Sequence, residues 1–367
     1  MLVMVSITDT ISLIMNSEDA MKIIDLRSDT VTHPTPDMRK AMADAEVGDD
    51  VFRDDPTTIR LEQKAAELLG MESALFVSSG TQGNLVALLS HVQRGGEVLL
   101  GDKSHIYLNE GGGASALGGI GYNVVNNDSR GMIFPEQILD AIKTVDVHHS
   151  RSSLVALENT HNVCGGLPLS AADIDSVGEV AHKNNMPLHI DGARIFNAAT
   201  ALETSVSDLV SAADSVTFCL SKGLSCPIGS ILCGPRDFIE EARHWRKMLG
   251  SGMRQVGIIA AAGIVALDTM IERLSEDHEN ARNLALGLAN IPGISIQPDL
   301  VQTNLVFFEI KGVDPVRLKD RINENGVLGG NIIPRWRFAT HYGINDEDIE
   351  KTLEVMRIAM KVEQEAL

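Results

Sequence analysis

Residues 74–91 read ALFVSSGTQGNLVALLSH, and this stretch decides the fold class. A short apolar run, Ala74–Val77, is followed by a turn with two glycines and then by a helical pattern, Leu85–His91. Alternation of this kind makes parallel strands that are joined by helical crossovers. The stretch therefore predicts one unit of an α/β sheet.

The same alternation continues along the chain as far as Gly234. Several strand candidates are apolar almost throughout, which is expected where helices cover both faces of a sheet. The predicted strands are Ala74–Val77, Glu97–Leu100, Leu154–Leu157, Pro187–Ile190, Ser215–Leu220 and Gly229–Cys233. A helical stretch from about Asp237 closes this block, so a large domain is predicted over residues 23–270, after an N-terminal extension, 1–22.

The pattern changes after Leu274. A polar helix runs through Asn290, and shorter strands and helices alternate behind it. The predicted elements are strands Ile294–Gln297, Asn304–Ile310 and Arg335–Thr340, a helix Pro315–Asn325 and a last amphipathic helix from Asp346. They predict a small α+β domain over residues 271–367.

The charge and the cysteines exclude several classes of protein. The 367 residues carry a formal net charge of −19, which repels nucleic acid and anionic membranes, so a bound anion needs a locally built site. No run reaches the roughly 18 apolar residues of a membrane span. The four cysteines form no C-x-x-C pair and no metal-ligand cluster with histidine, which favours a cytoplasmic protein with reduced thiols and no metal site.

The glycine turn is a candidate anion site. In Ser79-Gly80-Thr81-Gln82-Gly83-Asn84 the glycines let the backbone approach closely, and the N–H groups and the dipole of the following helix favour a phosphate. An ordinary strand-to-helix turn explains the same residues, and the spacing matches neither the P-loop nor the dinucleotide motif.

Two further motifs follow later strands. In His189-Ile190-Asp191-Gly192-Ala193-Arg194, the Asp191 carboxylate could hold a cationic ring nitrogen or simply cap a helix. In Cys219–Ser225, small and apolar neighbours favour a neutral, nucleophilic amine on Lys222, although an isolated lysine is more often a surface residue. Together the three motifs fit the phosphate, ring nitrogen and aldehyde of one ligand, pyridoxal phosphate.

From Ile24 to the last helix, the sequence closely resembles the low-specificity L-threonine aldolases, a family of fold type I pyridoxal-phosphate enzymes. The matching blocks are Asp25–Thr32, Gly48–Thr57, Gly80-Thr81-Gln82, Glu158–Asn162, Asp191–Asn197, Leu220–Leu224 and Gly252–Gln255. The resemblance implies a large domain with a mostly parallel seven-stranded sheet. It also implies retro-aldol cleavage of L-threonine, L-allo-threonine and other β-hydroxy-α-amino acids to glycine and an aldehyde.

The resemblance implies roles for individual residues as well. Lys222 resembles the Schiff-base lysine, Asp191 the partner of the pyridine nitrogen, and His105 the histidine that stacks on the ring. The other residues that look like cofactor contacts are Gly80, Thr81, Gln82, Arg194, Ser221 and Arg254, and those that resemble holders of the substrate carboxylate are Ser28, Arg194 and Arg337. Because Arg254 is expected to reach across a subunit interface, a homo-oligomer is implied, with a tetramer built as a dimer of dimers.

Some assignments stay open at the level of sequence. His161 and Glu110 are both candidates for the base that takes the substrate hydroxyl proton, and a structural hydrogen bond explains either residue equally well. Phe52 stands where many relatives carry tyrosine, which removes a phenol from that place. An aminotransferase or a β-eliminating lyase shares the lysine, aspartate and phosphate turn, and a catalytically silent homologue is a further alternative. The block 26–32 and the histidine expected over the ring favour the aldolase.

Overall fold

The structure, a computed structural model, describes residues 22–330 and 335–366. Its centre is a seven-stranded sheet in the order β2-β8-β7-β6-β5-β3-β4. The strands are β2 (Ser73–Val77), β3 (Gly96–Gly101), β4 (Gly121–Val125), β5 (Arg151–Glu158), β6 (Leu188–Asp191), β7 (Ser215–Cys219) and β8 (Ser230–Gly234). β8 runs antiparallel to its two neighbours, and the other adjacent pairs are parallel. The predicted fold class, with a mostly parallel seven-stranded sheet, is confirmed.

The sequence patterns locate six of these seven strands. The strand they miss is β4, which lies at an edge of the sheet next to β3. Its five residues, GYNVV, are exposed or half-buried. An edge strand with little burial lacks the continuous apolar run by which the inner strands were found.

Helices bury both faces of the sheet. Alternate residues of a strand point to opposite faces, so Leu99 of β3 packs in one core while Val98 and Leu100 pack in another. The helices that contribute to the first face are α2 (Pro36–Ala43), α3 (Pro56–Leu69), α6 (Pro135–Ala141), α7 (Ala171–Lys183), α8 (Ile195–Ala201), α9 (Val206–Leu209) and α11 (Gly257–Thr269). Those on the second face are α4 (Gly80–His91), α5 (His105–Leu108), η2 (Ala114–Gly118) and α10 (Arg236–Met248).

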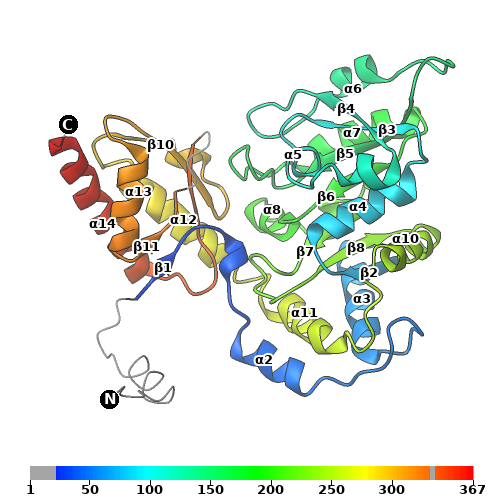
Figure 1. The fold of residues 1–367 in the computed structure, drawn as a ribbon, viewed down its shortest axis with the longest axis horizontal. Coiled ribbons are helices and arrows are strands. Elements are labelled where there is room, and N and C mark those ends of the chain that lie inside the picture. Colours follow the sequence, from blue (N-terminus) through cyan, green and yellow to red (C-terminus); the bar gives the residue numbers. More distant parts are fainter. Residues whose placement is uncertain (1–21, 331–334, 367) are drawn as a thin grey trace, which may run out of the picture.

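A second core lies beside this sheet, on the left of Figure 1. It is built on an antiparallel sheet in the order β12-β10-β9 and on three helices. The elements are β9 (Ile294–Ser295), β10 (Leu305–Ile310), β12 (Trp336–Ala339), α12 (Leu274–Leu288), α13 (Pro315–Glu324) and α14 (Asp346–Glu365), with the short helix η3 (Pro298–Leu300). These elements lie close to the predicted ones, and the boundary proposed at residue 270 stays a prediction.

The start of the described chain belongs to this second core. β1 (Ile24–Asp25) pairs in parallel with β11 (Val327–Leu328), and Ile24 and Leu26 are buried there. The chain then passes through the short helix η1 (Asp29–Val31) to α2 below the large sheet (Figure 1). Residues 1–21 of the predicted extension lie outside the described residues. Among the helices that the structure describes, none is long and apolar enough to cross a membrane.

Three parallel strands end at one edge of the large sheet and place the polar motifs there. Glu158 ends β5 and is the register partner of Asp191, which ends β6. Cys219 ends β7, and Lys222 follows three residues later. Ligands of open α/β sheets bind at such carboxyl ends, so the search for the site begins here.

Candidate active site

The glycine turn at the start of α4 presents backbone donors that have no partner. Ser79 caps the helix through its side-chain oxygen, and no described residue accepts from the N–H groups of Gly80 and Thr81. A Cβ at Gly80 would lie 2.8 Å from Cys219 Sγ, so glycine lets the turn approach the end of β7 closely. Nearby, Ser230 Oγ is also buried without a partner. An anion at this helix N-terminus would satisfy these groups.

Asp191 is buried and is held by two donors. Its Oδ2 accepts a side-chain N–H of Asn84 at 2.8 Å, and its Oδ1 accepts the backbone N–H of Ala193 at 3.2 Å. Thr217 is its register partner on β7, and the buried Thr217 Oγ1 has no hydrogen-bond partner among the residues that the structure describes. The plane of the Asp191 carboxylate is therefore fixed at the sheet edge.

His105 is oriented by two carboxylates. Its backbone N–H donates to Glu158 Oε2 at 2.7 Å, and its Nδ1 lies 2.9 Å from Glu110 Oε1. The hydrogen bond to Glu110 raises the pKa of His105, while burial raises the pKa of Glu110. Glu110 Oε1 also accepts from Asn84 at 2.8 Å. Glu110 therefore holds the imidazole ring in place.

His105, Glu110 and Asp191 also form a possible group of metal ligands. One ligand atom of each residue lies within 4.8 Å of the others. However, the Asn84 amide already donates to both carboxylates, and a donor at that place competes with a cation for the same oxygens. The arrangement suits the ring of an organic cofactor better than a metal ion.

Asp29 and Arg194 form a buried ion pair. Arg194 Nε and Nη2 donate to the two carboxylate oxygens of Asp29 at 2.7 and 2.8 Å. Burial alone would raise the pKa of Asp29, but the adjacent guanidinium holds it well below its ordinary range. Two parallel hydrogen bonds fix the guanidinium plane.

Arg337 lies beside this ion pair. Because Trp336 and Phe338 face the second core, the intervening Arg337 points to the other side of β12. Its Nη1 donates to Asn162 Oδ1 at 2.9 Å, and Nη1 of Arg194 reaches the same oxygen at 3.3 Å. Burial and the charge of Arg194 lower the pKa of Arg337, whose buried Nε has no hydrogen-bond partner within residues 22–330 and 335–366. Two guanidinium groups thus converge on a neutral amide oxygen, where a carboxylate would be a stronger acceptor.

We call Asp29, Asn162, Arg194 and Arg337 the arginine clamp. Ser28 stands next to Asp29 in the chain, and Arg337 Nη2 donates to the carbonyl of the preceding residue, Arg27, at 3.2 Å. The structure thus brings together Ser28, Arg194 and Arg337, which were predicted to hold a substrate carboxylate.

Lys222 lies in a loop that is held by hydrogen bonds to the Lys222 carbonyl. Its carbonyl oxygen accepts Thr32 Oγ1–H at 3.1 Å and the backbone N–H of Ser225 at 2.8 Å. Its positive charge acts with the Arg194 contacts described above to lower the pKa of Asp29, against the effect of burial, which raises it. The charges of Arg194, Lys222 and Arg337 therefore all act near the Asp29 carboxylate. This local positive charge favours an anionic ligand in a chain whose net charge is −19.

His161 is fully buried, and neither of its ring nitrogens has a hydrogen-bond partner among the described residues. Its Nδ1 lies 3.8 Å from Glu158 Oε1. Gly131 packs against the ring so closely that a Cβ there would lie 2.4 Å from it. A buried imidazole with two unpaired nitrogens is unusual, and a ligand or water that pairs with it would lower the free energy of the site.

Three of the predicted cofactor contacts form their hydrogen bonds or ion pairs with neighbouring residues of the protein. Gln82 Oε1 accepts the N–H and hydroxyl of Ser78, so Gln82 stabilises the turn. The Ser221 N–H donates to the loop carbonyl of Gly229 at 3.3 Å. Arg254 is exposed, pairs with Asp49 at 2.9 Å and lies over the ring of Phe52. None of the hydrogen bonds or ion pairs among the described residues joins Arg254 to another predicted site residue.

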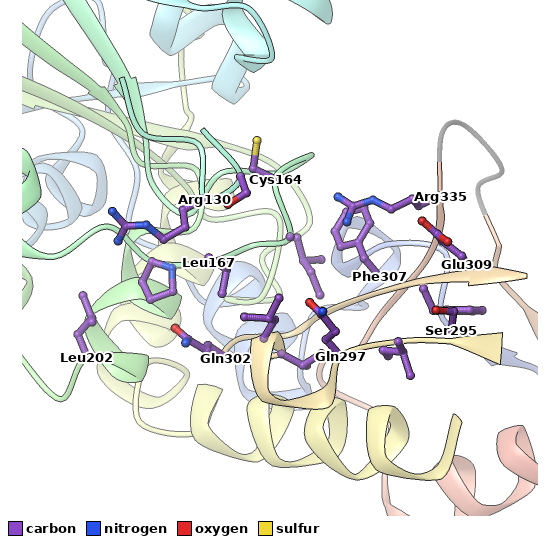
Figure 2. A pocket seen from close by; sticks show the side chains of 18 of the residues that line it. Arg130, Cys164, Leu167, Leu202, Ser295, Gln297, Gln302, Phe307, Glu309 and Arg335 are labelled. Atoms are coloured by element: carbon purple, nitrogen blue, oxygen red, sulfur yellow. The ribbon is translucent and has the colours of Figure 1, made fainter. Parts of the chain in front are cut away.

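A cavity of about 760 Å³ lies elsewhere, between the loops of the large sheet and the second core (Figure 2). Leu167, Phe307 and Arg335 are among its lining residues, and Arg335 stacks on the Phe307 ring at 5.0 Å. None of the predicted site residues lines it. Because Lys222, Asp191 and the arginine clamp do not line this cavity, we place the candidate active site at the carboxyl ends of β5, β6 and β7.

Three residues of the site received no role from the sequence. Asp29 and Asn162 stand inside blocks that the resemblance covers, and Asn84 is the last residue of the candidate glycine turn. A signal existed for Asp29, because an arginine buried beside a strand end requires a carboxylate partner. No comparable signal points to the two asparagines, whose partners are distant in sequence.

Solved structures show which class of protein has this fold. The structure matches threonine aldolase from Leishmania major with a TM-score of 0.78 at 20% identity, over 92% of this chain and 99% of that one. It matches serine palmitoyltransferase from Sphingomonas wittichii with a TM-score of 0.73 at 17% identity, over 93% and 88%. The fold is that of the fold type I pyridoxal-phosphate enzymes.

Sequence relatives narrow this class to a family. The family model described as "Beta-eliminating lyase" matches residues 25–311. The chain is 46% identical to the probable low-specificity L-threonine aldolase 2 of Arabidopsis thaliana, over 91% of this chain and 96% of the relative. It is 44% identical to the low specificity L-threonine aldolase of Escherichia coli K12, over 89% and 96%. The chain belongs to the beta-eliminating lyase family and, within it, to the low-specificity L-threonine aldolases, so the predicted family is confirmed.

Proposed function

We propose that this protein is a pyridoxal-phosphate-dependent lyase that cleaves L-threonine, L-allo-threonine and other β-hydroxy-α-amino acids to glycine and an aldehyde. The observation that carries the proposal is the placement of Lys222, Asp191 and the arginine clamp at one edge of the sheet. The names and coverage of the relatives support the same activity.

The residues at this edge fit the cofactor. The unpaired N–H groups of Gly80 and Thr81 suit its phosphate, the Asp191 carboxylate suits a protonated ring nitrogen, and the Lys222 amine suits its aldehyde. His105, held by Glu110, would lie against the ring. When bound, pyridoxal phosphate supplies an electron sink for the pair released as the Cα–Cβ bond breaks.

The arginine clamp would orient the substrate. Arg194 uses Nε and Nη2 on Asp29, whereas the buried Nε of Arg337 has no partner in the described part of the chain, so Arg337 would provide the larger part of the contact. A carboxylate held there, with Ser28 alongside, has its rotation about Cα restricted. This restriction would hold the Cα–Cβ bond in a single orientation, and such positioning lowers the barrier to cleavage.

Of the two candidates for the β-hydroxyl proton, we assign His161. Glu110 already forms hydrogen bonds with His105 and Asn84, while no described residue pairs with either ring nitrogen of His161. Comparing His161→Asn with Glu110→Gln separates the two candidates. If His161 is the base, His161→Asn should have the lower kcat and should still retain the cofactor. A larger loss of kcat in Glu110→Gln would reverse the assignment.

A direct assay tests the function. Purified protein is incubated with L-threonine, L-allo-threonine and their D isomers, and acetaldehyde is measured. We expect acetaldehyde and glycine from both L isomers and neither product from the D isomers. Keto-acid production without acetaldehyde would indicate an aminotransferase, and a protein without visible absorption from the cofactor would indicate a silent homologue.

We expect Arg337→Ala to lower kcat/KM for L-threonine by about 30-fold, or about 2 kcal/mol, because a charge-assisted contact to the substrate carboxylate is lost. Lysine should restore only part of the activity, since a point charge cannot reproduce the planar fork. Arg335→Ala is the matched control, because Arg335 stacks on Phe307 and donates to the Val163 carbonyl, and it forms no hydrogen bond with a clamp residue among the described residues. Near-normal cleavage by Arg337→Ala would remove Arg337 from the substrate site, and loss of cofactor would move it to the phosphate.

We also propose a cytoplasmic homotetramer whose minimal active unit is a dimer. Arg254 and Phe52 support it, because the Phe52 ring is 75% exposed and the Arg254 side chain beside it is half-exposed. Light scattering should therefore give a mass of about four chains, and Arg254→Ala should weaken the retention of pyridoxal phosphate. A fully active monomer would contradict the assignment of Arg254 to a neighbouring subunit's phosphate site.

A further inference from the structure

A row of polar side chains extends from Asp191 into the sheet, and its members beyond Asn84 have no part in the chemistry described so far. His91 Nε2 lies 2.8 Å from Ser215 Oγ, and the same oxygen lies 2.9 Å from His189 Nδ1. His189 Nε2 lies 3.1 Å from Asn84 Oδ1. The Asn84 amide completes the row at Asp191 Oδ2. Except for the half-buried His91, these side chains are buried.

Regular secondary structure builds this row. Asn84 and His91 stand seven residues apart on α4 and so lie on one face of the helix. His189 and Asp191 alternate on β6 and share a face of the sheet. Ser215 is the register partner of His189 on β7. The row is therefore part of the rigid framework and does not depend on a loop.

The contacts determine where each proton lies. Asn84 donates its two N–H groups to Asp191 and Glu110, because the opposite orientation would place its oxygen against two carboxylates. The Asn84 oxygen therefore accepts from His189, which must carry its proton on Nε2.

The remaining protons follow from this one. Burial lowers the pKa of His189 to about 3 and that of His91 to about 4, so both rings are neutral near pH 7. With its proton on Nε2, His189 accepts the Ser215 hydroxyl at Nδ1, and Ser215 Oγ accepts from His91 Nε2–H. Every donor in the row points toward Asp191.

We propose that Asn84 is a positioning residue for the Asp191 carboxylate, and that His189, Ser215 and His91 hold the Asn84 amide in the orientation that donates to both carboxylates. This inference rests on the proposed function, in which Asp191 faces the ring nitrogen of the cofactor. Without Asn84, two carboxylates with ligand atoms within 4.8 Å of each other would have no donor between them. Their repulsion would turn Asp191 away from the ring.

The affinity of the apo-protein for pyridoxal phosphate tests this role. We expect Asn84→Ala to weaken binding by about tenfold or more, the effect of losing a hydrogen bond to a charged group. Asn280→Ala is the matched control: Asn280 is a buried asparagine on α12 whose amide donates to the Ile344 carbonyl at 3.0 Å. It should lower the melting temperature and leave cofactor affinity unchanged. Unchanged affinity in Asn84→Ala would overturn the proposal.

The proton positions are tested on the unaltered protein. Side-chain 15N NMR should show that His189 carries its proton on Nε2 and none on Nδ1. A proton on Nδ1 would contradict the proposed direction of the hydrogen bonds along the row. Ser215→Ala, which removes a link remote from the cofactor, should weaken pyridoxal-phosphate binding by about threefold or more. Wild-type affinity in that variant would overturn the part assigned to His91 and Ser215. If the wild-type protein binds no pyridoxal phosphate, the proposed function fails, whereas the His189 tautomer is still decided by NMR.

Discussion

Lys222→Ala is expected to retain no covalent pyridoxal phosphate and to lower kcat by about 10³-fold, because the variant loses both the amine that bonds the cofactor aldehyde and a group that can move protons at Cα. The loop that carries Lys222 is held by its backbone contacts to Thr32 and Ser225. The substitution should therefore leave the fold intact, and the melting temperature of the apo-protein should change little. Borohydride reduction of the wild-type protein followed by peptide mass spectrometry should place the cofactor on Lys222.

Lys183→Ala serves as the control for this experiment, because Lys183 pairs with Glu179 on the exposed side of α7. It should retain the cofactor and full activity. An adduct on another lysine, such as Lys103 or Lys183, would show that the motif around Lys222 was assigned wrongly.

Asp29→Ala is expected to lower the free energy of unfolding by about 3–5 kcal/mol, because it leaves the Arg194 guanidinium buried and unpaired. The folded-state pKa of Asp29 is depressed, so its contribution to stability is present above its ordinary value of 3.8 and is lost as the pH falls below that value. When the pH is lowered from 7 to 3, the free energy of unfolding of the variant should therefore fall less than that of the wild type. Denaturant unfolding at pH 7 and at pH 3 measures both effects.

The control for Asp29→Ala is Asp277→Ala, since Asp277 is a buried carboxylate that forms a two-bond contact with Arg273 outside the clamp. Both variants should lose stability, but only Asp29→Ala should also raise KM for the amino acid. A wild-type KM in Asp29→Ala would show that Arg194 needs no help from Asp29 to stay in place.

The inner strands could be predicted because burial on two faces leaves a continuous apolar run, as in Leu154–Leu157. The edge strand β4 escaped prediction because its GYNVV sequence is only partly buried. Lys222 and Asp191 could be selected because each follows a strand within a recognisable motif. The partners of Arg194 and Asp191 could not be selected, because they are distant in sequence. Asp29 lies 165 positions from Arg194, and Asn84 lies 107 positions from Asp191, so only the folded chain brings each pair together.

The pairing of β1 with β11 has a consequence for how the protein is made. Ile24 and Leu26 are synthesised early, yet Ile24 pairs with Val327, and both residues belong to a core that includes Met356 of α14. The large sheet can therefore form first, while the opening segment waits with its apolar side chains uncovered until the last helix has been synthesised. Because Ser28 and Asp29 directly follow that segment, the proposed site for the amino-acid carboxylate is completed only when residues 24–26 pack against the core formed by the later residues.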